Sequence, residues 1–196
     1  MEKKKLVVAS GNAHKIAEIS AIFPDFEVVS QKSMGFNVDV DETGDTFVEN
    51  ALIKARACAT ALGCPAVADD SGICVDALGG APGVHSARYC GKHGDDKANR
   101  DLLLQNLSGE SNRKAHFTSA VALVYPDGRE IVVEGHTYGE IIHEERGEGG
   151  FGYDCLFFSD DLQKTFGEAS AEEKNAVSHR YRALQELRKK WREQDL

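Results

Sequence analysis

The chain of 196 residues lacks any apolar run long enough to cross a membrane. After the basic start at Lys3, the apolar stretch from Leu6 to Ala9 is also too short for the core of a signal peptide. The five cysteines are odd in number and form no CxxC pair, a pattern that disfavours disulfides and a structural zinc site. We therefore expect a soluble cytoplasmic protein whose thiols stay reduced.

Positive charge is also scarce, because 23 lysines and arginines face 32 aspartates and glutamates, for a formal net charge of −9. An acidic surface repels the phosphate backbone of DNA and RNA, so a nucleic acid is not an expected partner, and neither is a membrane. A small anionic ligand is compatible with this charge where basic groups gather locally, preferably with a divalent cation.

The chain has no internal repeat and no low-complexity linker, and its length fits a single domain over 1–196, or one domain with two lobes. Thr46 with Glu49 and Ser170 with Glu173 are capping boxes that predict two helix starts. The expected strands cover 6–9, 28–29, 66–68, 117–125 and 130–134, and the expected helices cover 16–23, 46–62, 95–107 and a stretch from 170 onward. This order predicts an α/β fold with a mixed sheet, since the hairpin excludes an all-parallel one.

The stretch from Gly147 to Asp154 is the most distinctive part of the sequence, because it holds four glycines, two aromatic residues and a carboxylate. Glycines allow a ligand to approach the main chain, and Phe151 and Tyr153 offer flat rings on which a heterocycle can stack. Asp154 can accept a hydrogen bond from a ring N–H. Glycine-rich runs are more often flexible surface loops, but exposed linkers rarely carry Phe and Tyr, so the pattern indicates a purine pocket.

A second candidate lies between the first strand and the first helix, where the run Ser10-Gly11-Asn12 precedes Lys15. The free N–H groups and the positive dipole end of a helix N-terminus bind anions, and Lys15 adds a full charge there. The Gly-x-x-x-x-Gly-Lys signature of a P-loop is absent. On spacing alone, an ordinary cap by Asn12 with Lys15 in solvent explains the pattern equally well, and His14 is expected at the surface.

Two carboxylates, Asp69 and Asp70, follow directly on the expected strand at 66–68. Paired carboxylates at a strand end commonly hold Mg²⁺ beside phosphate, whereas the alternative is an Asx-turn that caps the strand. Glu42 can supply another metal oxygen from the acidic loop of residues 39–45. The sequence does not choose among the carboxylates of that loop, which are Asp39, Asp41, Glu42 and Asp45.

Basic residues gather in the last helical stretch, at Lys174, His179 and Arg180. On an unbroken helix Lys174 and Arg180 would lie about 120° apart, so they can serve one ligand only if the helix breaks near Ser178. Basic residues on a solvated helix face are the alternative.

Together and in this order, these motifs closely resemble the inosine triphosphate pyrophosphatases, also called dITP/XTP pyrophosphatases. The likeness spans nearly the whole chain. The matching motifs are residues 10–12 with Lys15, residues 42–44, 46–47, 49–51 and 54–55, residues 68–72, 79–83 and 86–89, and residues 149–154 with 173–174 and 178–180. Cys155, where many members have proline, and Ser10 in place of threonine are small departures that leave the activity in place.

The resemblance implies an elongated α/β domain with two lobes around a central mixed sheet flanked by helices, and an active site in the cleft between the lobes. It further implies a homodimer and a Mg²⁺-dependent enzyme. Such an enzyme hydrolyses ITP, dITP and XTP to the monophosphate and pyrophosphate, and so clears these nonstandard purine nucleotides from the pool.

The resemblance also assigns roles to residues of this chain. Asp70 is implied as the general base, and Glu42 and Asp70 as the metal ligands. The residues implied to hold the phosphates are Ser10, Gly11, Asn12, Ala13, His14, Lys15 and Lys54, with Ser71 as a further substrate contact. The residues implied to hold the purine are Phe151, Gly152, Tyr153, Asp154, Lys174, His179 and Arg180.

Two other functions stay open on the sequence. A Maf-like pyrophosphatase that acts on modified pyrimidine nucleotides would share the scaffold, and the purine-pocket loop disfavours it. A nucleotide-binding sensor without catalysis is disfavoured by Asp69 and Asp70, since binding alone needs no base at a metal. Ser71 has no adjacent histidine, which favours direct attack by water over a covalent enzyme intermediate.

Overall fold

The computed structural model describes residues 3–194, and the chain divides into two compact units. Unit 1 consists of Met1–Asp70, Ser119–Gly135 and Arg180–Leu196, and unit 2 consists of Ser71–Thr118 and His136–His179. Each unit is therefore built from stretches that lie far apart in the sequence.

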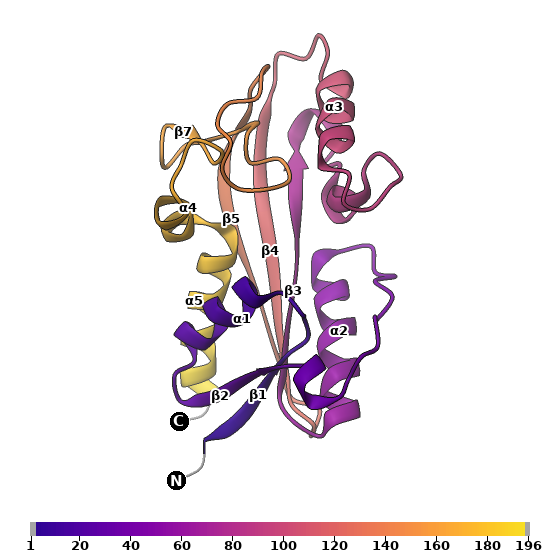
Figure 1. Cartoon of the computed structure of the whole chain (residues 1–196), viewed down its shortest axis with the longest axis vertical. Helices are drawn as coiled ribbons and strands as arrows, with labels where there is room; N and C mark the ends of the chain where they lie inside the picture. Colours follow the sequence, from indigo (N-terminus) through magenta and orange to yellow (C-terminus); the bar gives the residue numbers. More distant parts are fainter. Residues whose placement is uncertain (1–2, 195–196) are drawn as a thin grey trace. The chain divides into compact units, whose positions relative to one another are not determined.

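The strands of residues 3–194 form a seven-stranded sheet in the order β2-β1-β3-β4-β5-β6-β7 (Figure 1). The strands are β1 Lys4–Val8, β2 Phe26–Ser30, β3 Ala66–Val75, β4 Lys114–Val124, β5 Glu130–Ile141, β6 Phe157–Ser159 and β7 Lys164–Thr165. The strand β1 pairs in parallel with β2 and β3, whereas β6 pairs antiparallel with β5 and β7. The sheet is therefore mixed.

Helices flank this sheet. The α-helices are α1 Ala13–Ile22, α2 Phe47–Leu62, α3 Asp96–Asn106, α4 Ala171–Val177 and α5 His179–Gln194, and short 3-10 helices cover Lys32–Met34, Asp76–Leu78 and Gly83–Arg88. The predicted α/β fold with a mixed sheet and flanking helices is confirmed. None of the helices within residues 3–194 is long and apolar enough to span a bilayer.

In unit 1, α1 and α5 lie on one side of the strands and α2 lies on the other (Figure 1). The side-chain alternation of β1 explains this arrangement. Leu6 and Val8 join a core that includes Ile19 of α1 and Leu184 of α5, while Val7 between them is also buried. This packing holds the N-terminal turns of α1 and α5 beside β3, where charged side chains meet.

The core of unit 2 is richer in aromatic rings. Phe117 packs edge-on against Phe157, with 4.8 Å between the ring centroids. Leu103 of α3 is fully buried in the same core, and so α3 is anchored against it. Tyr153 also belongs to this core, so the glycine-rich stretch enters it near its C-terminal end.

The strand that carries the paired carboxylates is longer than expected. The prediction that it ends at residue 68 is wrong, because β3 continues to Val75 and places Asp69 and Asp70 inside the strand. Four polar or small residues in a row resemble a turn, and only the burial of Ile73 and Val75 shows that the strand goes on. The short strands β6 and β7 were also not predicted, since two or three residues are too few to show a pattern.

The predicted helix starts are confirmed. Thr46 with Glu49 caps α2, and Ser170 with Glu173 caps α4, each pair as a complete capping box. The final helical stretch is two helices, because Ser178 has an extended backbone with ψ of 152° between α4 and α5. The helix therefore breaks near Ser178, which is the condition for Lys174 and Arg180 to serve one ligand.

Candidate active site

The loop between β1 and α1 ends in a helix cap. The side chain of Asn12 accepts hydrogen bonds from the backbone N–H groups of His14 at 2.9 Å and Lys15 at 3.3 Å. The N–H of Asn12 in turn donates to the hydroxyl oxygen of Ser10 at 3.1 Å. Residues 11–14 are exposed at this helix end, where the positive end of the dipole favours anions. The cap by Asn12 is confirmed.

Lys15 does not extend into solvent but joins an ion-pair cluster around Asp69. Its ammonium lies 2.8 Å from one carboxylate oxygen of Asp69, and Nε of Arg180 lies 3.2 Å from the other. Lys54 reaches the same residue from α2, because its ammonium donates to the Asp69 carbonyl oxygen at 2.8 Å. Arg180 also pairs with Glu18 at 3.3 Å. We call Asp69, Lys15, Lys54 and Arg180 the Asp69 cluster.

Asp69 itself is almost fully buried, with 6% of its surface exposed. Burial raises the pKa of its carboxyl group, but Lys15 and Arg180 more than offset that effect, and the pKa falls well below its usual range. The carboxylate therefore stays charged and holds both cations in place. The sequence suggested Asp69 only as one of two paired carboxylates for Mg²⁺, because only the tertiary structure brings Lys15 and Arg180 to it.

Asp70 has different surroundings, because successive residues of a strand point to opposite faces. Asn50 of α2 donates to its Oδ2 at 3.0 Å, and Lys54 nearby pairs with Glu42 at 3.2 Å. Burial raises the pKa of Asp70 to about 6, while Lys54 opposes this rise and Glu42 adds to it. A carboxylate with that pKa can take up a proton near neutral pH.

Glu42 and Asp70 fit a divalent cation. Two neighbouring carboxylates repel each other when both are charged, and a bound cation removes that repulsion. Across residues 3–194, no group of three or more Asp, Glu, His or Cys side chains could hold a metal ion by itself. A pair of carboxylates suits Mg²⁺, which proteins usually bind through one or two carboxylates together with waters and substrate phosphates.

The glycine-rich stretch, residues 147–154, lies in unit 2 and is called the glycine loop below. The Asp154 carboxylate, only 3% exposed, accepts hydrogen bonds from the N–H of Phe151 at 2.9 Å and from the Lys174 ammonium. A side chain at Gly150 would collide with this carboxylate, because its Cβ would lie 2.1 Å from Oδ2. Asp154 thus orients the loop and Lys174 directly, and a contact between Asp154 and a purine stays a prediction.

The two aromatic residues of the glycine loop differ in exposure. Phe151 is 68% exposed, and the Lys174 ammonium lies 4.4 Å from the centroid of its ring. Tyr153 is buried, and its hydroxyl donates to the carbonyl oxygen of Ser86 at 2.7 Å. Phe151 rather than Tyr153 therefore offers a stacking surface to a ligand.

His179 and Arg180 are neighbours in the sequence but belong to different units. His179 stacks on Phe117 of the unit 2 core, with 5.0 Å between the ring centroids, whereas Arg180 joins the Asp69 cluster in unit 1. Lys174 lies with the glycine loop in unit 2. Ser71 follows Asp70 within β3 and is the first residue of unit 2.

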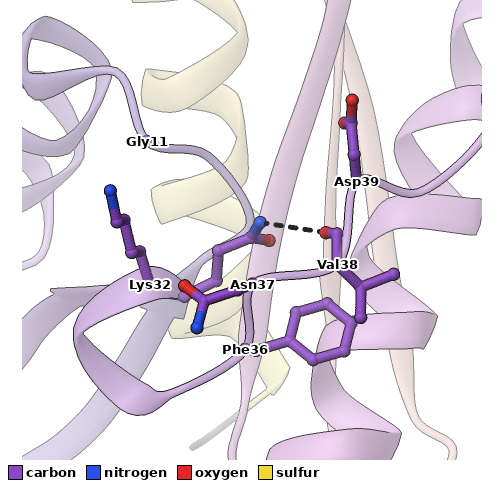
Figure 2. Close-up of a pocket in the computed structure, with 7 residues that line it drawn as sticks. Gly11, Lys32, Phe36, Asn37, Val38 and Asp39 are labelled. Carbon is purple, nitrogen blue, oxygen red and sulfur yellow. Dashed lines mark hydrogen bonds between the residues drawn. The ribbon is translucent and has the colours of Figure 1, made fainter.

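A cavity of about 300 Å³ lies beside Gly11 in unit 1 (Figure 2). The Gln31 side-chain amide donates to the carbonyl oxygen of Val38 at 3.5 Å along its wall. The lining residues are Gly11, Gln31, Lys32, Phe36, Asn37, Val38 and Asp39. Sequence reasoning singled out only Gly11 and Asp39 among them, because the stretch from 31 to 38 carries no recognisable motif.

A family model described as the Ham1 family matches residues 6–190 of this chain. The chain belongs to the Ham1 family. A relative from Streptomyces avermitilis, a dITP/XTP pyrophosphatase, is 53% identical over 189 residues, which cover 93% of this chain and 94% of that protein.

Two solved structures show the same likeness. The Staphylococcus aureus Ham1 protein has a TM-score of 0.93 and 41% identity, covering 97% of this chain and all of the other. A nucleoside-triphosphatase / dITP/XTP pyrophosphatase from Mycobacterium abscessus has a TM-score of 0.81 and 49% identity, covering 93% of this chain and 98% of the other. Since the Ham1 match covers both units, the Asp69 cluster and the glycine loop both lie within the family's sequence.

Proposed function

We propose that this chain hydrolyses nonstandard purine nucleoside triphosphates, namely dITP, XTP and ITP, to the monophosphate and pyrophosphate, and so clears them from the nucleotide pool. The observation that carries this function is the arrangement around β3. Cations gather at Asp69, and the carboxylates of Glu42 and Asp70 meet beside Lys54. Membership in the Ham1 family and the similarity to dITP/XTP pyrophosphatases support the same function.

Two cations of the Asp69 cluster, Lys15 and Lys54, suit the triphosphate part of the substrate. A nucleoside triphosphate carries about four negative charges, which lysines, helix N-terminal N–H groups and a divalent cation can offset together. Lys15 stands in the first turn of α1, and Lys54 lies between Glu42 and the Asp69 carbonyl oxygen. We assign Ser10 to Lys15 and Lys54 to the phosphates.

Asp70 is the proposed general base. Its carboxylate lies beside Lys54 and accepts a hydrogen bond from Asn50 at 3.0 Å, so it is held in place to accept a proton from a water molecule. That water attacks the α-phosphorus in line, the bond from the α-phosphorus to the bridging oxygen breaks, and pyrophosphate leaves with its charge met by Lys15 and Lys54. Mg²⁺, held by Glu42 and Asp70, would neutralise phosphate charge when bound.

The glycine loop suits the base part of the substrate. Phe151 provides the stacking surface, and Lys174, His179 and Arg180 are the proposed donors to the keto oxygen at C6 of hypoxanthine or xanthine. Adenine carries an amino group there, and leaving a buried donor unpaired costs about 1–3 kcal/mol, so ATP should be a poor substrate. Guanine shares the keto oxygen, and its 2-amino group must meet an obstacle within residues 151–154.

We also propose that residues 1–196 act as a single pyrophosphatase domain, that the metal is Mg²⁺, that the enzyme is cytoplasmic and that it works as a homodimer. The family resemblance supports Mg²⁺ and the homodimer, the length of 196 residues supports a single domain, and the five cysteines without a CxxC pair support the cytoplasm. Light scattering at micromolar protein should report about twice the chain mass of 21.3 kDa, and a mass near 21.3 kDa would rule out a stable dimer.

Pyrophosphate release from a panel of nucleotides tests the proposed function. The panel contains ITP, dITP, XTP, ATP, GTP and a modified pyrimidine triphosphate, each with and without Mg²⁺. We expect kcat/KM for ITP and XTP to exceed that for ATP and GTP by at least about 10²-fold. Arg180→Ala should narrow the gap between ITP and ATP by depressing ITP hydrolysis.

Other outcomes of the nucleotide panel would contradict the proposed function. Preferred cleavage of the pyrimidine nucleotide would indicate a Maf-like enzyme, and nucleotide binding without turnover would indicate a sensor. Equal cleavage of ITP and ATP, or of ITP and GTP, would contradict the keto-reading pocket and the pool-clearing function with it.

A further inference from the structure

Helix α3 holds the glycine loop through both backbone polar groups of one residue. The N–H of Gly152 donates to the Asp96 carboxylate at 3.0 Å, and its carbonyl oxygen accepts from Nη1 of Arg100 at 2.9 Å. Asp96 and Arg100 are four residues apart on α3, so their side chains leave the helix on the same face. One helix face therefore fixes the peptide groups on both sides of Gly152.

The Arg100 side chain is itself held in place. Its Nε donates to Glu145 at 2.8 Å, and only 16% of the side chain is exposed. Burial acts to lower the pKa of Arg100, but the hydrogen bond to Glu145 and neighbouring negative charge more than offset that, and the pKa is raised. Leu103 anchors the same helix in the unit 2 core. Asp96 and Arg100, which we call the clamp, are thus attached to a rigid element.

The residue next to the clamped peptide is Phe151. With 68% of its surface exposed, its ring packs little, so its position depends on the backbone of the loop together with the Lys174 ammonium 4.4 Å from the ring centroid. Gly152 has φ of +60°, and a Cβ there would touch nothing within 4 Å. Glycine is therefore favoured here by the left-handed backbone and not by a lack of room for a side chain. A flexible backbone of this kind needs an external hold, and α3 provides it.

We propose that Asp96 and Arg100 are positioning residues for purine recognition. By fixing Gly152 they hold the Phe151 ring in its stacking position before a nucleotide binds, which lowers the entropy cost of binding. They act through the glycine loop and not by touching the substrate. This inference rests on the proposed function, because it takes Phe151 as the surface on which the purine stacks.

Steady-state kinetics with ITP on the full-length enzyme test the proposal. Asp96→Ala and Arg100→Ala should each raise KM by about tenfold, the scale of a lost charge-assisted hydrogen bond. Their kcat should stay within about threefold of the wild type, since the loss falls on substrate binding. Asp96→Asn keeps an acceptor for the Gly152 N–H and should restore most of the wild-type KM. Lys97→Ala is the matched control, because Lys97 is 65% exposed on the same helix and pairs with Asp101 there.

A wild-type KM in both alanine variants would overturn the proposal, and so would an Asp96→Asn variant as impaired as Asp96→Ala. A fall in kcat with KM unchanged would overturn it too. If the alanine variants melt below the assay temperature, Arg100→Lys decides, because it keeps the charge but replaces the planar fork that joins Glu145 to Gly152. A wild-type KM in Arg100→Lys would then contradict the clamp. Failure of the wild type to cleave ITP would instead contradict the proposed function.

Discussion

The Asp69 cluster and the glycine loop differ in how far backbone groups help to hold them in place. In the Asp69 cluster, a buried carboxylate binds Lys15 and Arg180 as ion pairs, so charge fixes the side chains. In the glycine loop, Asp154 also forms an ion pair, with Lys174, but backbone groups take part as well, since Gly152 bonds to α3 and the N–H of Phe151 bonds to Asp154.

This difference matches what each region is proposed to bind. A triphosphate needs cations fixed in space, and a charged, buried counter-ion keeps them there. A neutral, flat base needs a platform with one open face, and hydrogen bonds to the backbone leave the Phe151 ring free to provide it. Substitutions in the Asp69 cluster should therefore act by removing a charge, and substitutions that affect the glycine loop should act by displacing the Phe151 ring.

Removal of the metal should have the largest effect. Activity should vanish in EDTA and return with excess Mg²⁺, because the carboxylates of Glu42 and Asp70 otherwise face a polyanion without a cation between them. Pyrophosphate release with ITP measures this. Full activity in chelator would contradict the role given to Glu42 and Asp70.

Asp70→Asn should lower kcat by at least about 10²-fold, the scale on which removal of a general base acts. ITP should still bind, because Lys15 and Lys54 are intact, and titration calorimetry can measure that affinity beside the kinetics. A variant with near-normal kcat would remove Asp70 from the role of base.

Asp69→Asn should destabilise the fold by about 3 kcal/mol, because Lys15 loses its carboxylate partner and Arg180 keeps only the more exposed Glu18. The same change should raise KM for ITP, since Lys15 and Arg180 lose the group that positions them. Urea unfolding and steady-state kinetics measure the two effects.

Glu18→Gln is the control for Asp69→Asn. Glu18 also pairs with Arg180, but its side chain is 32% exposed, so its loss should cost less than about 1 kcal/mol. Equal destabilisation by both variants would show that Asp69 is not the centre of the cluster.

Phe151→Ala should raise KM for ITP by about tenfold while leaving stability within about 0.5 kcal/mol of the wild type. The ring is 68% exposed, so its removal leaves no cavity in the core. A large loss of stability with unchanged KM would contradict this role, since the Phe151 ring would then stabilise the fold and not bind the ligand.

Tyr153→Phe should have the smallest effect on activity. It leaves the Ser86 carbonyl oxygen without its donor, which should cost about 1–3 kcal/mol at pH 7. Burial raises the pKa of Tyr153, so the stability that its neutral hydroxyl contributes is complete below the unfolded-state pKa of about 10 and is lost as pH rises toward the folded value. The stability gap between wild type and variant should therefore narrow above pH 10, and a gap that widens there would contradict the buried, neutral phenol.

Local signals in the sequence were enough to predict the helix caps, whereas they missed β6, β7 and the true end of β3. The capping boxes at Thr46 and Ser170 and the cap at Asn12 are confirmed, because a cap depends on residues three or four positions apart. The sequence does not show whether the last helical stretch breaks at Ser178, and the structure has that break. The roles given to the site residues stay predictions, since they concern a bound nucleotide.

The partners of each charge depended on the tertiary structure. Asp69 and Asp70 look like one pair in the sequence, yet the strand continues through them and turns them toward different helices. His179 and Arg180 are likewise adjacent, but one stacks on the unit 2 core and the other pairs with Asp69. The sequence by itself determined the helix caps, the glycine loop and the family, because those signals lie within a few residues of one another. Only the packing of α1, α2 and α5 around β3 decided which cation meets which carboxylate, because ion pairs between distant segments form only where the cores bring them together.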